Sequence, residues 1–459
     1  MAPDPLVYER RSTLPCSAEA AYRWHARGGA LERLTPPWEG IEIVSRRGGF
    51  ADGAETVLRV PVGPVRRRWL ARHRDHIPGR QFVDEQIEGP FARWVHTHRF
   101  VPCGADACDL EDRVEFEPPL GLPGRVIGEP FIRRALERVF SYRHRVTHDD
   151  LSAHARFGGL PPLTIAITGA TGLLGTSLDA FLTTGGHRVV RVVRHPTSDH
   201  DLRWDPATGR IDAEGLEGVD AVVHLAGESI AGGRWTRTAK LRIRDSRVRG
   251  TRLLAETLAR LKRRPAVLVS ASAIGYYGDR GDTLLDEQSG SGGGFLGEVC
   301  TAWEAASAPA WDAGIRVVNL RIGIVLTPAG GALAKLLPPF RLGVGGRLGS
   351  GTQWMSWISL DDTVGAIHHA ISSPALQGAV NAVAPEPVTN AEFTRTLARV
   401  LHRPALIPVP AAGLRLALGE MADALLLASC RVVPAKLQAS GYPFRHPTLE
   451  SALRYLLGR

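Results

Sequence analysis

The sequence predicts an α/β protein in which a doubly wound parallel sheet follows a separate α+β domain. From residue 163 onward, short apolar strands alternate with helices, which is the order that builds a parallel sheet covered by helices on both faces. Before residue 155, period-two stretches separated by turn residues indicate antiparallel strands. The chain has 459 residues, more than a single domain usually holds.

The composition is typical of a soluble globular protein. Hydrophobic residues make up 44% of the chain and charged residues 22%, which suits a real apolar core. The most apolar stretch, Leu414–Ser429, contains Arg415, Glu420 and Asp423. It is therefore predicted to be a buried amphipathic helix and not a membrane span. The N-terminus lacks the apolar segment of a secretory signal.

Cysteine usage predicts neither a disulfide framework nor a structural zinc site, and no metal site is expected. The five cysteines are scattered and form no C-x-x-C pair, the spacing that such sites normally require. Together with the missing secretory signal, this favours a reducing cytoplasm. The cysteines are Cys16, Cys103, Cys108, Cys300 and Cys430.

The net charge of +9 comes from an arginine-rich chain with clusters at Arg66–Arg68, Arg133–Arg134 and Arg263–Arg264. Such clusters could attract nucleic acid or an anionic cofactor. A solvated arginine-rich surface is the preferred interpretation, so no nucleic-acid partner is expected.

The N-terminal domain is predicted to span residues 1–155. Its period-two stretches include Ile41–Ser45, Glu55–Val60 and Arg113–Glu117. A Gly-Gly-Leu-Pro-Pro segment at 158–162 indicates a linker, and the domain boundary is placed within Leu151–Pro162.

The second domain is predicted over residues 162–404, followed by a small helical cap over 405–459. Apolar runs predict its strands, and helical spacing predicts the helices between them and in the cap. The expected strands are Leu163–Thr168, His187–Val193, Asp220–Leu225, Ala266–Ser270 and Arg316–Leu320. The expected helices are Leu173–Thr183, Lys240–Leu261, Ala411–Ala428 and Leu449–Leu457.

A glycine-rich turn, T-G-A-T-G-L-L-G, joins the first of these strands to its helix. Gly169 permits a tight turn, Gly172 lets a pyrophosphate approach the backbone, and Gly175 lets the helix pack against the strand. The helix N-terminus offers free N–H groups and the positive end of its dipole to phosphate. This strand–turn–helix context predicts a dinucleotide-binding Rossmann unit. The expected cofactor contacts in the turn are Gly169, Thr171, Gly172, Leu173, Leu174 and Gly175.

The end of the second strand favours NADP(H) over NAD(H). An NAD site usually has an acidic residue there, but this strand ends Arg191-Val192-Val193-Arg194-His195. Arg194 can pair with a 2′-phosphate and stack on adenine, although it could also be an ordinary surface arginine. Arg191 and Val193 are counted with it as expected cofactor contacts.

The next strand ends in the segment His224–Glu228, whose small residues would let the cofactor pass over the backbone. Leu225, Ala226, Gly227 and Glu228 are the expected contacts. The alternative is a tight strand-to-loop turn without a ligand.

These motifs resemble the extended, epimerase-like branch of the short-chain dehydrogenase/reductase superfamily, from Leu163 to the C-terminus. The turn, H-L-A-G-E, S-A-S-A-I-G-Y-Y-G (270–278) and R-I-G-I-V-L (321–326) follow in the order of that branch. A subgroup of epimerase-family proteins with poorly defined activity is more similar still. It shares F-L-x-E-V-C-x-x-W-E (295–304), W-I-x-x-D-D (357–362) and a short helical C-terminal domain.

Residues 1–155 are similar to the START-like helix-grip superfamily, which includes polyketide cyclases and coenzyme Q-binding proteins. The resemblance implies an antiparallel sheet that grips a long C-terminal helix, with an apolar cavity that could hold an apolar ligand. The residues that carry it are Leu14–Trp24, Leu34–Trp38, Gly89–Phe91, Phe140–His144 and Asp149.

The superfamily resemblance implies a Tyr-x-x-x-Lys pair with a serine, because tyrosine exchanges the proton as hydride moves. None of the seven tyrosines has lysine four residues on, and Phe295-Leu296-Gly297-Glu298-Val299 stands where the pair should lie. Tyr276 or Tyr277, with Ser270 or Ser272, are the candidate replacements. Glu298 and Cys300 could also reach the site. For each of them, packing is the alternative role.

The resemblance implies further contacts with less support from the residues themselves. Arg242 and Arg247 on the long helix could face phosphate or substrate, and Val325 lies where relatives touch the nicotinamide. Asp361 and Asp362 are expected to cap a helix that starts at Thr363, with substrate binding as the alternative.

Taken together, the sequence predicts an NADP(H)-dependent oxidoreductase or epimerase acting on a small carbonyl or sugar-like molecule. A non-catalytic NADP-binding sensor or scaffold is the alternative, because the Tyr/Lys pair is missing. A third hypothesis makes the N-terminal domain a cyclase or lipid carrier that feeds the second domain. None of the motifs specifies an oligomeric state.

Overall fold

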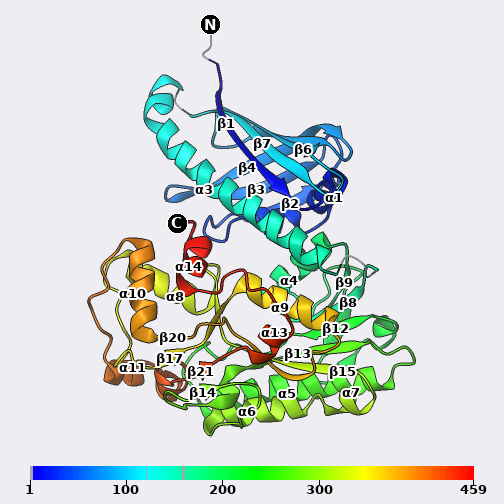
Figure 1. Ribbon diagram of the computed structural model, residues 1–459, viewed down its shortest axis with the longest axis vertical. Helices are drawn as coiled ribbons and strands as arrows, with labels where there is room; N and C mark the ends of the chain where they lie inside the picture. Colours follow the sequence, from blue (N-terminus) through cyan, green and yellow to red (C-terminus); the bar gives the residue numbers. More distant parts are fainter. Residues whose placement is uncertain (1–3, 120, 158–160) are drawn as a thin grey trace. The chain divides into compact units, whose positions relative to one another are not determined.

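The computed structural model describes residues 4–119, 121–157 and 161–459, and these form two compact units (Figure 1). The first unit runs to residue 157, and the second holds nearly all of the chain from Pro161 onward. The predicted boundary interval Leu151–Pro162 begins inside a helix, which runs to Ala155. The Gly158–Leu160 part of the predicted linker lies outside the described residues.

The first unit has the predicted helix-grip arrangement. Its seven-stranded antiparallel sheet has the order β1-β7-β6-β5-β4-β3-β2, and α3 (Gly121–Ala155) lies along one face of it (Figure 1). Helices α1 (Ala18–Ala26) and α2 (Ala30–Leu34) connect the first two strands. The strands are β1 (Leu6–Leu14), β2 (Glu42–Arg47), β3 (Glu55–Val62), β4 (Val65–Ile77), β5 (Gln81–Glu88), β6 (Arg93–Pro102) and β7 (Cys108–Glu117).

The START-like resemblance implied an apolar cavity between this sheet and α3. The space in the structure is only partly apolar. Side chains such as Trp24, Phe100 and Phe140 are almost fully buried. Beside them, however, His96, His98, Asp112 and His144 are also buried. Period-two patterning marks which face of a strand turns inward, but it does not exclude polar residues that find partners there.

The second unit contains the predicted doubly wound sheet. Its eight strands have the order β11-β10-β9-β8-β12-β13-β15-β19, and all neighbours are parallel except β10 and β11. The order reverses between β8 and β12, which is where such sheets bind ligands at their carboxyl edge. The strands are β8 (Thr164–Thr168), β9 (Arg188–Val193), β10 (Leu202–Asp205), β11 (Arg210–Ile211), β12 (Ala221–His224), β13 (Val267–Ala273), β15 (Arg316–Ile322) and β19 (Gly378–Ala382).

Helices cover both faces of this sheet (Figure 1). One face carries α5 (Arg237–Arg260), α6 (Gly294–Ala305) and α7 (Ala308–Asp312), while α4 (Leu173–Thr184) and α9 (Leu360–Ser372) lie on the other. The central strands β8, β12 and β13 are almost fully buried between them, as expected for a parallel sheet. Short pairs complete the unit: β14 (Leu284–Leu285) with β21 (Arg431–Val432), β16 (Ile324–Leu326) with β18 (Trp357–Ser359), and β17 (Trp354–Met355) with β20 (Val388–Thr389). The remaining helices include α8 (Gly331–Arg341), α10 (Asn390–Leu401), α13 (Ala435–Ala439) and α14 (Leu449–Leu457).

The predicted cap of α9 is wrong by several residues. The helix begins at Leu360, and its N-cap is Ser359, whose hydroxyl accepts from the Asp362 N–H at 2.9 Å. Serine is as good an N-cap as aspartate. The buried Asp362 carboxylate instead accepts from the backbone N–H groups of Arg445 (2.7 Å) and His446 (3.1 Å), so it holds the C-terminal segment.

The predicted buried amphipathic helix over Leu414–Ser429 is wrong, although most of the segment Ala411–Ala428 is helical as expected. The segment breaks at Gly419, where φ is +63°, into α11 (Ala411–Leu418), α12 (Glu420–Ala422) and a π-helical turn (Asp423–Leu427). α11 has no buried residue, and Leu416 is 81% exposed. Apolar spacing alone could not show whether a partner covers this face. Among the described helices, none combines the length and the apolar content needed to cross a bilayer.

Candidate functional site

The glycine turn after β8 depends on close backbone approaches. Gly169 has a φ of +70°, and a Cβ there would lie 2.8–3.0 Å from the backbone of Leu225 and Ala226. A Cβ on Gly175 would collide with the carbonyl oxygen of Gly169 and lie 2.7 Å from the Cα of Ala170. The turn is therefore pressed against the end of β12, and α4 is pressed against the turn.

The outer side of the same turn is open. Thr171, Gly172 and Leu173 are exposed at the amino end of α4, while Leu174 is half-buried. A Cβ on Gly172 would meet only the Gly169 carbonyl oxygen, at 3.3 Å. The first N–H groups of a helix have no intrahelical partner, so an exposed helix start next to a glycine can accept a pyrophosphate.

Two arginines at the end of β9 have different environments. Arg191 donates to both carboxylate oxygens of Asp201, at 2.9 and 3.1 Å. Arg194 is exposed one residue past the buried Val193 and has no hydrogen bond or ion pair within the described parts of the chain. Of the two, Arg194 has the free guanidinium that a 2′-phosphate requires.

The turn after β12 is tied to its surroundings on two sides. His224 is buried, with Nδ1 2.6 Å from the Thr168 hydroxyl, and burial lowers the pKa of His224 to about 4. On the other side, Arg242 donates to the Glu228 carboxylate and Arg247 to the Glu228 carbonyl oxygen, each at 2.9 Å. Both predicted arginines thus already have a partner within this turn.

Gly227 forms the exposed apex of this turn, with Leu225 and Ala226 half-buried behind it. A Cβ on Gly227 would lie 3.3 Å from the Arg247 guanidinium carbon. That guanidinium also lies 5.0 Å from the centre of the Trp303 ring. The turn is therefore compact, and it leaves its backbone accessible at the sheet edge.

Strand register places three polar residues in one row at the carboxyl ends of β13, β15 and β19. Ser272 pairs with Arg321, and Arg321 pairs with Asn381. Arg321, which is 3% exposed, donates from Nε and Nη2 to the two carboxylate oxygens of Glu304 on α6, both at 2.8 Å. Ser272 donates to the same carboxylate at 2.7 Å. These four residues are called the Arg321 network.

Tyr277 contacts two members of this network, Arg321 and Asn381. Its hydroxyl accepts from Arg321 at 3.0 Å and lies 2.7 Å from Asn381 Oδ1 and 2.8 Å from the Asp286 carbonyl oxygen. The side chain is fully buried, and burial raises the pKa of Tyr277 to about 12. These contacts suit a positioning role better than proton exchange near neutral pH.

Tyr276 has the opposite environment. It is half-buried, and the Arg321 guanidinium carbon lies 3.4 Å from the centre of its ring. Its hydroxyl makes no hydrogen bond to any residue that the structure describes. Ser270, by contrast, is fully buried, and its hydroxyl makes a long hydrogen bond to the Ala271 carbonyl oxygen, at 3.5 Å.

The other candidates from the sequence lie around this row. Glu298 is exposed, whereas Cys300 is buried, and burial raises the pKa of its thiol to about 11. Phe295 is half-buried between the Trp235 ring (5.0 Å) and the Lys240 ammonium (5.1 Å). Val325 is half-buried on β16, opposite Ile358 of β18.

Sequence reasoning missed Glu304, Arg321 and Asn381 as members of the site. For Arg321 and Glu304, the sequence contained an indication of this role. Arg321 is an isolated charge in an apolar strand, and Glu304 follows Trp303 on a largely apolar helix. Charged residues in such segments are rarely buried unless they are paired.

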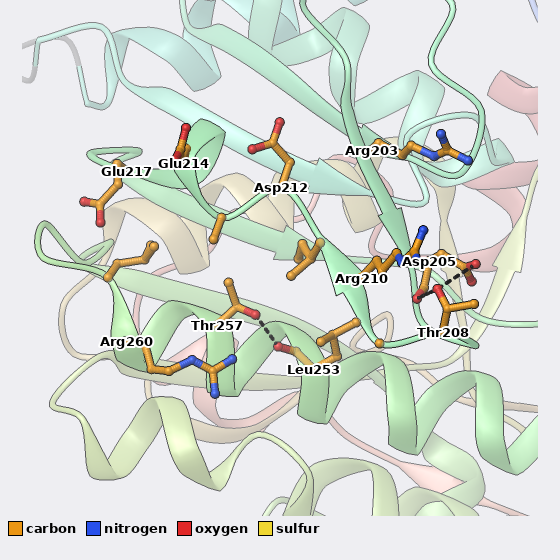
Figure 2. Close-up of a pocket in the computed structure, with 14 residues that line it drawn as sticks. Arg203, Asp205, Thr208, Arg210, Asp212, Glu214, Glu217, Leu253, Thr257 and Arg260 are labelled. Atoms are coloured by element: carbon orange, nitrogen blue, oxygen red, sulfur yellow. Dashed lines mark hydrogen bonds between the residues drawn. The ribbon is translucent and has the colours of Figure 1, made fainter.

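A separate groove of about 740 Å³ lies between the β10–β11 hairpin and the last turns of α5 (Figure 2). Its walls carry charges of both signs, such as Arg210, Arg260, Asp205 and Glu214. None of the predicted site residues lines it, so this groove is distinct from the glycine turn and the Arg321 network.

Comparisons with known families agree with the two units. The sequence profile described as "NAD dependent epimerase/dehydratase family" matches residues 165–383. The profile "Polyketide cyclase / dehydrase and lipid transport" matches residues 14–140, and "Domain of unknown function (DUF1731)" matches residues 409–456.

Individual relatives point the same way. An epimerase family protein of Mycobacterium bovis is 45% identical over 296 residues, which cover 64% of this chain and 98% of that protein. The structure described as the nucleoside-diphosphate sugar epimerase from Corynebacterium glutamicum is 35% identical, with a TM-score of 0.81, and covers 98% of this chain and 90% of its own. The human epimerase family protein SDR39U1 (isoform 2), described with NADPH, is 36% identical with a TM-score of 0.60 over 64% of this chain and 99% of its own. The chain therefore belongs to the NAD dependent epimerase/dehydratase family.

Proposed function

We propose that this protein is an NADP(H)-dependent oxidoreductase or epimerase that acts on a small carbonyl or sugar-like substrate. The observation that carries the proposal is the open glycine turn at the switch point of the sheet, with the unpaired Arg194 beside it. The human relative described with NADPH supports NADP(H) over NAD(H). The bound nicotinamide would donate or accept a hydride, and the chain's own residues would hold the cofactor and exchange the proton.

Tyr276 is the residue that we propose for the proton exchange. Unlike Tyr277, it has a hydroxyl without a partner in the described chain. Arg321 fixes its ring by a cation–π contact, and Glu304 fixes Arg321 in turn. Tyr276 would donate to, or accept from, the substrate oxygen, while Ser272 keeps the Arg321 network in place.

Changing Tyr276 to phenylalanine is expected to lower kcat about 10²–10⁴-fold, the usual contribution of a general acid or base. The assay follows NADPH oxidation with a panel of nucleotide sugars and small aldehydes and ketones. The dissociation constant for NADPH should not change. As a contrast, Tyr277→Phe should lower the free energy of unfolding by about 1–3 kcal/mol, because it leaves buried partners unsatisfied. Full turnover by the Tyr276 variant would contradict the assigned role.

Changing Arg194 to alanine is expected to weaken NADPH binding about 10–100-fold and to leave NADH binding unchanged. A charge-assisted hydrogen bond contributes about 1.5–3 kcal/mol, and only NADPH has the 2′-phosphate that would accept it. Titration calorimetry with both cofactors measures the difference. Arg188→Ala is the matched control, since Arg188 is exposed at the other end of the same strand. An equal loss for both cofactors would contradict a contact to the 2′-phosphate.

A non-catalytic NADP-binding sensor or scaffold is the second candidate. It is favoured by the fully bonded Tyr277 hydroxyl and by the missing Tyr-x-x-x-Lys pair. It predicts tight NADPH binding without turnover on the whole panel.

The cytoplasmic location stays a prediction, since one relative, from Arabidopsis thaliana, is named as chloroplastic.

A further inference from the structure

The first unit holds a second group of chemistry-bearing side chains, on the face of its sheet that α3 covers. Strand register aligns them: His73 on β4 lies opposite Asp84 on β5, and Asp84 lies opposite His96 on β6. Two residues along β6, on the same face, His98 lies opposite Asp112 on β7. These residues, with His144 of α3, are called the His–Asp cluster.

Three members of the cluster converge on one point. Asp84, His96 and His98 each offer one possible ligand atom within 4.8 Å of the other two. His98 Nε2 lies 3.2 Å from Asp84 Oδ2. Two ligands of one tetrahedral zinc ion, with bonds of about 2.0–2.1 Å, lie about 3.3 Å apart. This pair therefore has the separation of two ligands on a single ion.

The other members orient the convergent ones. Asp112 Oδ1 lies 2.9 Å from His96 Nε2 and 2.7 Å from His98 Nδ1. The ring nitrogens that do not contact Asp112 in these pairs are Nδ1 of His96 and Nε2 of His98. His144 Nε2 lies 2.7 Å from Asp112 Oδ2, and Ser12 lies 2.6 Å from the other nitrogen of His144.

The opposite side of the cluster is supported in the same way. His73 Nε2 lies 2.9 Å from Asp84 Oδ1, and the Phe82 ring stacks on His98 with centroids 4.0 Å apart. Carboxylates that hold the outer nitrogens of histidine ligands are the usual support of metal sites in proteins. The Asp84 side chain is 27% exposed, so an ion has a path to it.

We propose that Asp84, His96 and His98 bind one divalent transition-metal ion of the zinc type inside the first unit. Imidazole donors select such an ion over Mg²⁺ or Ca²⁺, which prefer oxygen ligands. Two imidazoles and one carboxylate leave at least one coordination position open. The ligand of this unit would therefore be a molecule that presents a carbonyl or carboxylate oxygen to the ion.

The test uses the full chain, stripped with a chelator and reloaded with Zn²⁺, and measures bound metal by mass spectrometry. About one ion per chain is expected, together with a Zn²⁺-dependent rise in the unfolding temperature. Asp84→Asn should lose both effects. Asp112→Asn keeps the three ligands but should weaken zinc affinity about 10–100-fold.

His148→Ala is the matched control, because His148 is exposed on α3 away from the cluster, and it should bind zinc as the unchanged protein does. Circular dichroism of the metal-free variants checks their folding. If Asp84→Asn fails to fold, the weaker zinc affinity expected of Asp112→Asn tests the proposal by itself. Wild-type protein that binds no zinc, or equal binding by wild type and Asp112→Asn, would overturn the proposal and leave the cluster as a hydrogen-bonded network.

Discussion

Changing Glu304 to alanine is expected to lower the free energy of unfolding by about 3–5 kcal/mol. Arg321 is 3% exposed, and Glu304 accepts two of its hydrogen bonds, both at 2.8 Å. Without the carboxylate, a buried guanidinium keeps its charge but loses its counter-ion. Ser272 loses its acceptor as well. Equilibrium denaturation followed by circular dichroism measures the change.

Glu298→Ala is the matched control for this experiment. Glu298 lies on the same helix, α6, but is exposed, so its removal should change the free energy of unfolding by less than about 0.5 kcal/mol. Similar losses from the two variants would mean that the helix, and not the ion pair, is the sensitive feature. The prediction would also fail if Glu304→Ala were as stable as the unchanged protein.

Changing Gly175 to alanine is expected to lower the free energy of unfolding of the second unit by about 3 kcal/mol. The added Cβ would collide with backbone atoms of Gly169 and Ala170, and backbone cannot rotate away as a side chain can. Moving the turn by about 1 Å should also weaken NADPH binding about 10²-fold. Denaturation and cofactor titration measure the two effects.

The Gly172→Ala variant tests NADPH binding separately from the stability of the fold. Its Cβ would meet only one carbonyl oxygen, at 3.3 Å, on the exposed side of the turn. We therefore expect little change in unfolding and a loss of at least about tenfold in NADPH affinity, because the methyl group would occupy the path of the pyrophosphate. If Gly172→Ala bound NADPH normally, the cofactor would not lie on this turn.

The sequence alone determined the two fold classes, five of the eight strands in the sheet of the second unit, and the place of the glycine turn. Helical and period-two spacing are local consequences of how a segment buries one face. The role of Gly175 follows from contacts within one strand–turn–helix unit. Arg194 could be singled out because its position depends only on where β9 ends. Each of these inferences rests on a few neighbouring residues.

The tertiary structure decided which polar residues meet. Ser272, Glu304, Arg321 and Asn381 come from four separate segments, and strand register brings them into contact with Tyr277. The missing cysteine pairs indicated no metal site, yet Asp84, His96 and His98 converge across two strands. Tyr276 and Tyr277 are adjacent in the sequence, but Tyr277 is fully buried whereas Tyr276 is half-buried. Strand register, burial and the choice of hydrogen-bond partners are set by packing between distant segments. The periodicity of a short segment does not show how distant segments pack.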